Sequence, residues 1–413
     1  MVHATEVLGA ETYDANGNYV GRVREMFIEP ADQPNRVSRL LLSRGRYNPL
    51  LARHDQVAFV APGSVKLNVD ERVLEAFHPN EGWLAMRKDL LDQQIIDTSG
   101  RKVVRVNDVD LHDVRTNGTM ELRVFQVDVG LTGAVRRLLQ GLASPALIRR
   151  LQEKLPPAII RWEFVNLIEP DPLRRVKLRI TSTRLEKIHP ADLADILEDL
   201  APPERQAIID SVDEETAAEA LAELDKRLQT QIVEKLDPEK AADIIEEMAP
   251  DEAADLLADL PPETKQEVLD EMPREEAQEV RELLRFEAHT AGGLMNTEFV
   301  FVGEGATREE VIEWIRQQDL NFEHLDTVFV IDRQAKLSGA VAMGRLLLAG
   351  AGQTMAELKS ELLLCVPAEA EDAEVFEMFD KYNLRSLAVV NPEGNPIGAI
   401  TVDDVLGALR AAE

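Results

Sequence analysis

Cysteine is almost absent from this sequence of 413 residues. Cys365 stands alone, so neither a disulfide framework nor a zinc site built from several thiolates can form within one chain. No hydrophobic run approaches the roughly 18 residues that a membrane span requires, and the amino terminus lacks the charged-then-apolar pattern of a signal peptide. These absences predict a soluble, cytoplasmic protein without a transmembrane segment.

Signatures of catalysis are missing as well. The seven histidines are scattered and form no zinc-binding pair, and the sequence has neither a nucleophile elbow nor a phosphate-binding loop. The glycine-rich residues 290–294 are not followed by the Lys and Ser or Thr of such a loop, and we expect them to form a hinge instead. The sequence therefore predicts no enzyme.

Positive charge is scarce in one part of the chain. The net charge is −30, and residues 181–290 hold 32 Asp and Glu against 11 Lys and Arg, whereas residues 1–180 hold 23 against 26. An acidic field repels nucleic acid and attracts cations, of which hard multivalent ions neutralise clustered carboxylates best. We therefore expect no nucleic-acid partner. The alternative to a metal site is that these charges only keep a polar face soluble.

The acidic part of the chain is also a repeat. Residues 189–284 consist of eight units of twelve residues, each apolar at its last position and again four residues earlier. That spacing marks one face of a helix, and proline near the unit starts suits a first helical turn. Because such short helices are marginal alone, we expect them to stack into an all-α superhelix. The last positions of the units are Leu200, Val212, Leu224, Leu236, Met248, Leu260, Met272 and Leu284.

The first 180 residues predict small β-barrels. Residues 14–18 (DANGN) form a strong hairpin signal, because Asn-Gly supplies the positive φ of a tight turn. Residues 90–114 repeat the pattern of residues 6–30, and both segments resemble the PRC-barrel module, which implies protein docking. Residues 133–157 are basic and amphipathic, and either contact an anionic membrane or partner or cover the end of a barrel.

Two βαββα units follow the repeats. The first covers residues 298–358, with strands expected at 299–302, 328–331 and 338–341 and a helix at 308–317. The second covers residues 362–409, with strands at 363–366, 387–390 and 397–400 and helices at 373–382 and from 402 onward. The second unit resembles a CBS domain and the first matches it in outline. Such modules usually form a pseudo-symmetric pair, and pairs often dimerise.

The order of these elements resembles the cytosolic part of the MgtE magnesium transporters. The resemblance rests on MAPDEAADLLADL (residues 248–260), HTAGGLMNTEFVFV (residues 289–302) and the CBS pair, and covers about residues 184–410. It implies a magnesium sensor whose superhelix and CBS pair close on the ion. The chain departs from the family twice, because it ends at Glu413 where the pore should begin and carries two barrels in front.

We therefore expect a multidomain α+β chain. Its predicted parts are PRC-barrel-like modules at residues 1–80 and 85–180, the second including the basic segment, a superhelix at 184–288 and tandem CBS domains at 289–413.

Aspartates predict where magnesium binds. Asp251 and Asp255 are spaced i, i+4 on one helix, so their carboxylates project from one side and repel a facing carboxylate such as Asp404. Magnesium retains waters and needs only one or two carboxylates from each side. The resemblance places the metal ligands at Asp251, Asp255 and Asp404, with Asp380 as a further ligand, and Asn383 where the family can show a carboxylate. The alternative is that Asp251 is a helix-terminal charge and Asp255 is merely solvated.

A second site is predicted by residues 398–404 (GAITVDD). CBS domains that bind ATP or AMP contact the nucleotide through a Gly, Thr and Asp pattern, which Gly398, Thr401 and Asp404 match. Residues 339–345 of the first unit lack both the threonine and the aspartate. The alternative is that Thr401 only caps the helix that follows.

The sequence thus predicts a magnesium-sensing regulatory protein. It would form a homodimer through the CBS pair and dock a partner, such as a separately encoded membrane transporter. Two alternatives remain, an adenosine-nucleotide sensor and a ligand-independent adaptor whose acidic superhelix binds a basic protein.

Overall fold

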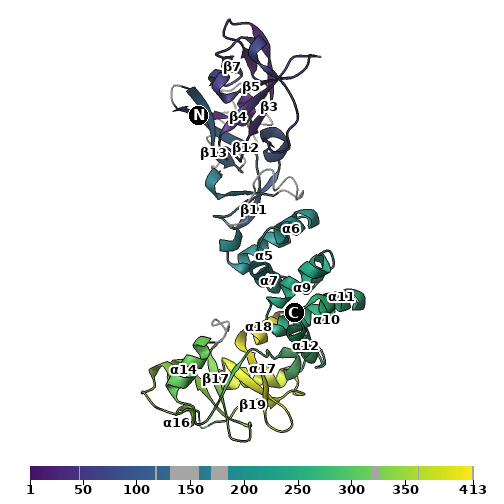
Figure 1. Ribbon diagram of the computed structural model, residues 1–413, viewed down its shortest axis with the longest axis vertical. Coiled ribbons are helices and arrows are strands. Elements are labelled where there is room, and N and C mark those ends of the chain that lie inside the picture. Colours follow the sequence, from purple (N-terminus) through teal and green to yellow (C-terminus); the bar gives the residue numbers. More distant parts are fainter. Residues whose placement is uncertain are drawn as a thin grey trace. The chain divides into compact units, whose positions relative to one another are not determined.

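The computed structural model describes residues 1–45, 47–116, 119–130, 158–168, 185–317, 325–360 and 362–411 (Figure 1). The chain divides into two compact units, Met1–Glu223 and Leu224–Glu413, and the division falls inside the helical repeat. Among the described residues, no helix is both long and apolar enough to cross a membrane. The basic segment predicted at residues 133–157 lies outside the described residues.

The first sheet of unit 1 has the strand order β6-β7-β2-β3-β4-β5-β8, with β9 paired to β3. The predicted hairpin at residues 14–18 joins β2 to β3 and is confirmed. Oδ1 of Asp14 accepts hydrogen bonds from the backbone N–H groups of Asn16 (2.9 Å) and Asn18 (2.8 Å), and Gly17 has φ +86°. The strands are β2 (Glu11–Tyr13), β3 (Tyr19–Ile28), β4 (Val37–Ser43), β5 (Leu50–Arg53), β6 (Val57–Ala61), β7 (Ser64–Leu67), β8 (Glu75–Ala76) and β9 (Leu84–Ala85).

The second half of the strand-rich region contains two smaller sheets, β1-β12-β13-β14 and β11-β10-β15. Its first hairpin repeats the chemistry of Asp14, because Oδ1 of Asp97 accepts the N–H of Ser99 (3.1 Å). A Cβ at Gly100 would lie 2.3 Å from Oδ2 of Asp97, so a larger residue there would displace the Asp97 carboxylate. The strands are β1 (Val2–His3), β10 (Gln94–Asp97), β11 (Lys102–Arg105), β12 (Asp108–Thr116), β13 (Thr119–Asp128), β14 (Ile159–Arg161) and β15 (Val165–Leu167).

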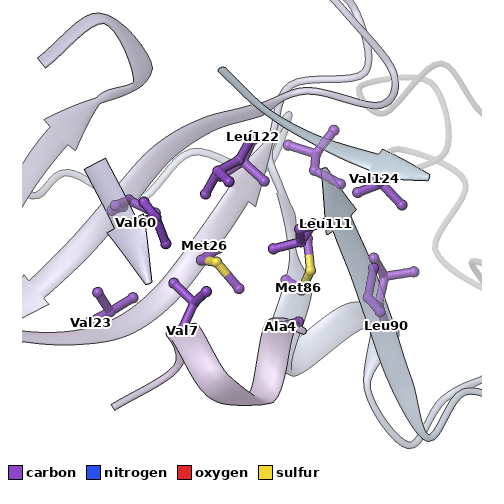
Figure 2. Packing of buried hydrophobic residues seen from close by; sticks show 14 of the residues in the cluster. Ala4, Val7, Val23, Met26, Val60, Met86, Leu90, Leu111, Leu122 and Val124 are labelled. Carbon is purple, nitrogen blue, oxygen red and sulfur yellow. The ribbon is translucent and has the colours of Figure 1, made fainter. Parts of the chain in front are cut away.

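The two strand-rich halves share one hydrophobic core. The amino-terminal strand β1 pairs with β12 of the second half, and helix α1 (Ala4–Val7) follows it directly. Figure 2 shows Ala4 and Val7 within the cluster that contains Met26 from the first half and Leu111 from the second. The two modules expected from the sequence are therefore joined by the first residues of the chain.

The predicted helical repeat is confirmed. Helices α5 (Pro190–Asp199), α6 (Pro202–Ile209) and α7 (Glu214–Ala222) belong to unit 1. In unit 2 follow α8 (Lys226–Val233), α9 (Pro238–Glu246), α10 (Pro250–Asp259), α11 (Pro262–Glu271) and α12 (Arg274–Leu283). The inner apolar position of every unit is buried, and α10 packs against α8 and α12. These inner positions are Ile196, Ile208, Ala220, Ile232, Ile244, Leu256, Val268 and Val280.

The CBS pair in unit 2 has two similar halves, as predicted. The first contains the sheet β16-β17-β18 and the second the sheet β19-β20-β21, each with one parallel and one antiparallel pairing. Phe329 and Leu337 of the first half pack with Ala388 and Ala399 of the second. The first half consists of β16 (Val300–Gly303), α14 (Arg308–Gln317), β17 (Thr327–Ile331), β18 (Leu337–Ala342), α15 (Met343–Leu348) and α16 (Met355–Leu358). The second consists of β19 (Cys365–Pro367), α17 (Asp372–Tyr382), β20 (Ser386–Val390), β21 (Pro396–Thr401) and α18 (Val402–Ala411).

The segment predicted as a hinge is packed in the structure. Helix α13 (Ala291–Leu294) lies against the second CBS half, where the N–H of Ala291 donates to the carbonyl of Ala370 (2.8 Å). Asn296 and Ala399 exchange both backbone hydrogen bonds, of 2.8 and 2.9 Å. These bonds fix residues 290–296 to the second half. The two glycines make room for the preceding residues, because a Cβ at Gly292 would lie 2.4 Å from the Phe286 ring and one at Gly293 would lie 2.6 Å from the carbonyl oxygen of Glu287.

Candidate metal site at α10 and α18

Asp251 lies at the amino terminus of α10. Ala249 is the N-cap and Pro250 occupies the first helical position, so Asp251 stands in the first turn, where the helix dipole favours a negative charge. Oδ1 of Asp251 is nevertheless inaccessible to solvent and has no hydrogen-bond partner. A buried carboxylate oxygen without a hydrogen-bond partner in the protein is costly, and a proton, a water or a cation can offset that cost.

Asp404 lies in the first turn of α18. Its Oδ2 accepts the backbone N–H of Thr401 at 2.6 Å and the Thr401 hydroxyl at 2.8 Å. These two bonds join Thr401 to the first turn of the helix that begins at Val402, and they fix the orientation of the Asp404 carboxylate. Thr401 is thus bonded to the helix that follows it, which is the helix that the alternative to nucleotide binding concerned.

The two carboxylates interact electrostatically. Burial raises the pKa of Asp251 well above its ordinary value, the charge of Asp404 raises it further, and Glu252 adds a smaller effect of the same sign. The ionised form of Asp251 is thus destabilised by the loss of water and by two neighbouring negative charges. Either a proton or a cation between Asp251 and Asp404 would relieve this repulsion.

The residues present fit a hydrated magnesium ion. The unpartnered Oδ1 of Asp251 and the carboxylate of Asp404 supply hard oxygen ligands from two separate helices. Over the ranges that the structure covers, no group of three or more His, Cys, Asp or Glu side chains is arranged to hold a metal. Water must therefore complete the coordination, which suits magnesium because it dehydrates reluctantly.

The other two predicted ligands have different surroundings. Asp255 forms an ion pair with Lys226 of α8, with 3.0 Å between Nζ and Oδ2. Asp380 is exposed on α17, and Asn383 ends that helix in the left-handed conformation with φ +54°, which asparagine tolerates better than most residues. The structure thus brings together Asp251 and Asp404 of the four predicted ligands.

The predicted nucleotide motif is packed rather than open at its glycine. A Cβ at Gly398 would lie 2.6 Å from Sδ of Met295, so the glycine makes room for that buried side chain. The first CBS half uses Gly339 similarly, because a Cβ there would meet the side chain of Lys359 at 2.9 Å. These contacts explain both glycines without a ligand.

Sequence reasoning missed two features of this region, Met295 over Gly398 and Lys226 beside Asp255. Helix packing determines both contacts, and the sequence offered a signal only for Lys226, because α8 has no acidic residue in its first turn.

Two regions of the chain match known families. The family described as MgtE intracellular N domain matches residues 188–289, and the CBS domain family matches residues 360–411. The magnesium transporter MgtE of Thermus thermophilus is 35% identical over 129 residues, which are 31% of this chain and 29% of that transporter. MgtE of Enterococcus faecalis is 25% identical over 129 residues, 28% of its length. The chain spans less than a third of these relatives.

Solved structures agree with the family matches. The crystal structure of the cytosolic domain of the Mg²⁺ channel MgtE in complex with ATP has a TM-score of 0.53 and 31% identity, and the match covers 56% of this chain and 94% of that domain. The soluble part of a magnesium transporter has a TM-score of 0.52 over the same share of this chain and 91% of its own, and at 23% identity it shows the fold alone.

Proposed function

We propose that this chain, which contains an MgtE intracellular N domain and a CBS domain and is homologous to the cytosolic domain of MgtE, is a magnesium-responsive regulatory protein. The observation that carries the proposal is the buried, unpartnered Oδ1 of Asp251 beside the Asp404 carboxylate. A divalent cation between the two carboxylates would supply the positive charge that offsets their repulsion.

The response follows from charge. Without a cation, the ionised carboxylates of Asp251 and Asp404 repel each other, and protonation of Asp251 favours the approach of α10 to α18. With magnesium bound through retained waters, both carboxylates stay ionised and the contact is stabilised. The approach of α10 to the second CBS half then becomes more stable as the magnesium concentration rises, until the site is saturated.

The output of this response is regulation of a partner. The magnesium transporters that match the chain suggest a separately encoded membrane transporter as that partner, with the strand-rich region as the docking part. We further propose a homodimer through the CBS pair, because Leu347 and Leu348 of α15 and Leu406 and Leu409 of α18 expose apolar surface.

A nucleotide is the second candidate ligand. Gly398, Thr401 and Asp404 match the nucleotide pattern, and a related cytosolic domain, 31% identical, was solved with ATP. In this chain Asp404 already accepts two hydrogen bonds from Thr401, so ATP or AMP would have to compete with these bonds and with magnesium for the same carboxylate.

Hydrogen exchange tests the proposed function. Magnesium should slow exchange of the amides at the start of α10 and of α18, whereas calcium and sodium chloride at matched ionic strength should have weaker effects. Asp251→Ala combined with Asp255→Ala should abolish the protection. Equal exchange with magnesium and with EDTA would refute the proposal and favour a nucleotide sensor or an adaptor.

A further inference from the structure

Asp255, a predicted ligand on the same helix as Asp251, has a cationic partner. Nζ of Lys226 lies 3.0 Å from Oδ2 of Asp255 and 4.0 Å from Oδ2 of Asp259. The side chains of Lys226 and Asp255 are each 55% exposed, so a hydrated ion can reach them.

Lys226 occupies an unusual position in its helix. Each of the other seven repeat helices, α5–α7 and α9–α12, carries an acidic residue in its first turn, whereas α8 begins with Lys226 and Arg227 and has none. The helix dipole disfavours a cation at an amino terminus. The helix dipole of α8 therefore does not explain a lysine at this position. The attraction of its ammonium group to Asp255 and Asp259 of α10 does.

Three aspartates on α10 form an acidic stripe, whose two ends interact with different residues. Asp251, Asp255 and Asp259 are spaced four residues apart, so they follow one side of the helix and repel one another. Asp251 interacts with Asp404 at one end of the stripe, and Lys226 neutralises Asp255 and Asp259 at the other. Lys226 is thus the positive charge that neutralises Asp255 and Asp259, the two aspartates that follow Asp251 on α10.

We propose that Lys226 competes with magnesium for Asp255 and thereby sets the magnesium concentration at which the protein responds. The inference rests on the proposed function. While the ammonium group holds Asp255, the site offers only Asp251 and Asp404. When the ammonium group moves away, Asp255 adds a third carboxylate one helical turn from Asp251, and magnesium is bound more tightly.

Magnesium titrations of Lys226→Gln test the proposal. Exposed ion pairs are weak, so the half-saturating magnesium concentration should fall by about two- to five-fold. Hydrogen exchange at α10 or calorimetry measures this concentration. In an Asp255→Asn background the same substitution should leave the titration unchanged, because the ligand that Lys226 competes for is already gone. Lys226→Arg should keep the original value.

Replacing any lysine by glutamine makes this acidic surface more negative and so strengthens its attraction for cations in general. Lys235→Gln controls for this general effect. Lys235 is exposed in the same unit of the repeat. Equal shifts for Lys226→Gln and Lys235→Gln would overturn the role of Lys226 while leaving the magnesium response intact. If the unsubstituted chain showed no magnesium response, the proposed function would fail and this inference with it.

A readout without metal completes the test. In EDTA, a double-mutant cycle of thermal unfolding between Lys226→Gln and Asp255→Asn should show favourable coupling, because the pair is formed before magnesium arrives. Zero coupling would contradict the proposal.

Discussion

Asp404 on α18 raises the pKa of Asp251 on α10, although the two helices come from different parts of the sequence. Burial is the larger cause, and among the described residues no hydrogen-bond donor to Oδ1 of Asp251 compensates for it. Two carboxylates are therefore held together at a contact that becomes unfavourable when both are ionised.

Substitution of Asp251 by asparagine should stabilise the approach of α10 to α18 in the absence of metal. The amide side chain would lack the charge that repels Asp404, so in EDTA the free energy of unfolding of unit 2 should rise by about 1–3 kcal/mol, because an unpaired buried charge is removed. Magnesium should then add no further stability. Thermal unfolding with and without magnesium measures both effects.

Glu263→Gln is the matched control for Asp251→Asn, because Glu263 follows the proline at the start of α11 as Asp251 does in α10, but is exposed. Glu263→Gln should leave the magnesium response unchanged. A magnesium effect on the Asp251→Asn variant as large as that on the unsubstituted chain would contradict the assigned ligand.

The contact should depend on pH in the absence of metal. A carboxyl whose pKa is raised by folding contributes stability that is fully present below its unfolded pKa and is lost as the pH rises through the raised value. Hydrogen exchange of α10 and α18 in EDTA should therefore accelerate as the pH rises, beyond the intrinsic change in exchange rate. The Asp251→Asn variant should show only the intrinsic change in exchange rate. If the additional acceleration persisted in that variant, another group would be responsible for it.

Thr401→Ala separates the structural role of Thr401 from the nucleotide role. Loss of the hydrogen bond from the Thr401 hydroxyl to Asp404 should destabilise the start of α18 by about 1 kcal/mol, and Thr401→Ser should restore it. If ATP or AMP binds at this motif, Thr401→Ala should also weaken that binding as measured by calorimetry. Unchanged nucleotide affinity would remove the motif as a nucleotide site.

The shared core of the strand-rich region predicts cooperative unfolding. Leu111→Ala should cost about 2–5 kcal/mol, because the side chain is fully buried between the two halves. Amides of β3 and β13 should lose protection together, as hydrogen exchange in denaturant can show. Val114→Ala, an exposed change on the same strand, should cost less than about 0.5 kcal/mol. Independent unfolding of the two sheets would contradict a single core.

Local patterns predicted much of the fold. The twelve-residue register placed the inner residues, such as Ile196 and Leu256, on the buried face, because an i, i+4 pair can only mark one side of a helix. The DANGN turn and the strands of the CBS pair followed from local chemistry as well. The pairing of β1 with β12 did not, because a two-residue strand has no periodicity and its partner is distant in the sequence.

The candidate site was predictable only in part. The resemblance placed ligands at Asp251, Asp255, Asp404 and Asp380, and spacing placed Asp251 and Asp255 on one side of a helix. The ion pair between Asp255 and Lys226 of α8 was not predictable, because it is set by the packing of helices two repeats apart. Likewise, the glycine of the predicted nucleotide motif gave no sign that Met295 packs against it.

Small-angle scattering across a magnesium titration, starting from EDTA, tests the central claim most directly. The account predicts a saturable decrease in the radius of gyration that exceeds the effect of sodium chloride at matched ionic strength and is absent from the Asp251→Ala, Asp255→Ala variant. A scattering profile that stays the same from EDTA to millimolar magnesium would contradict it.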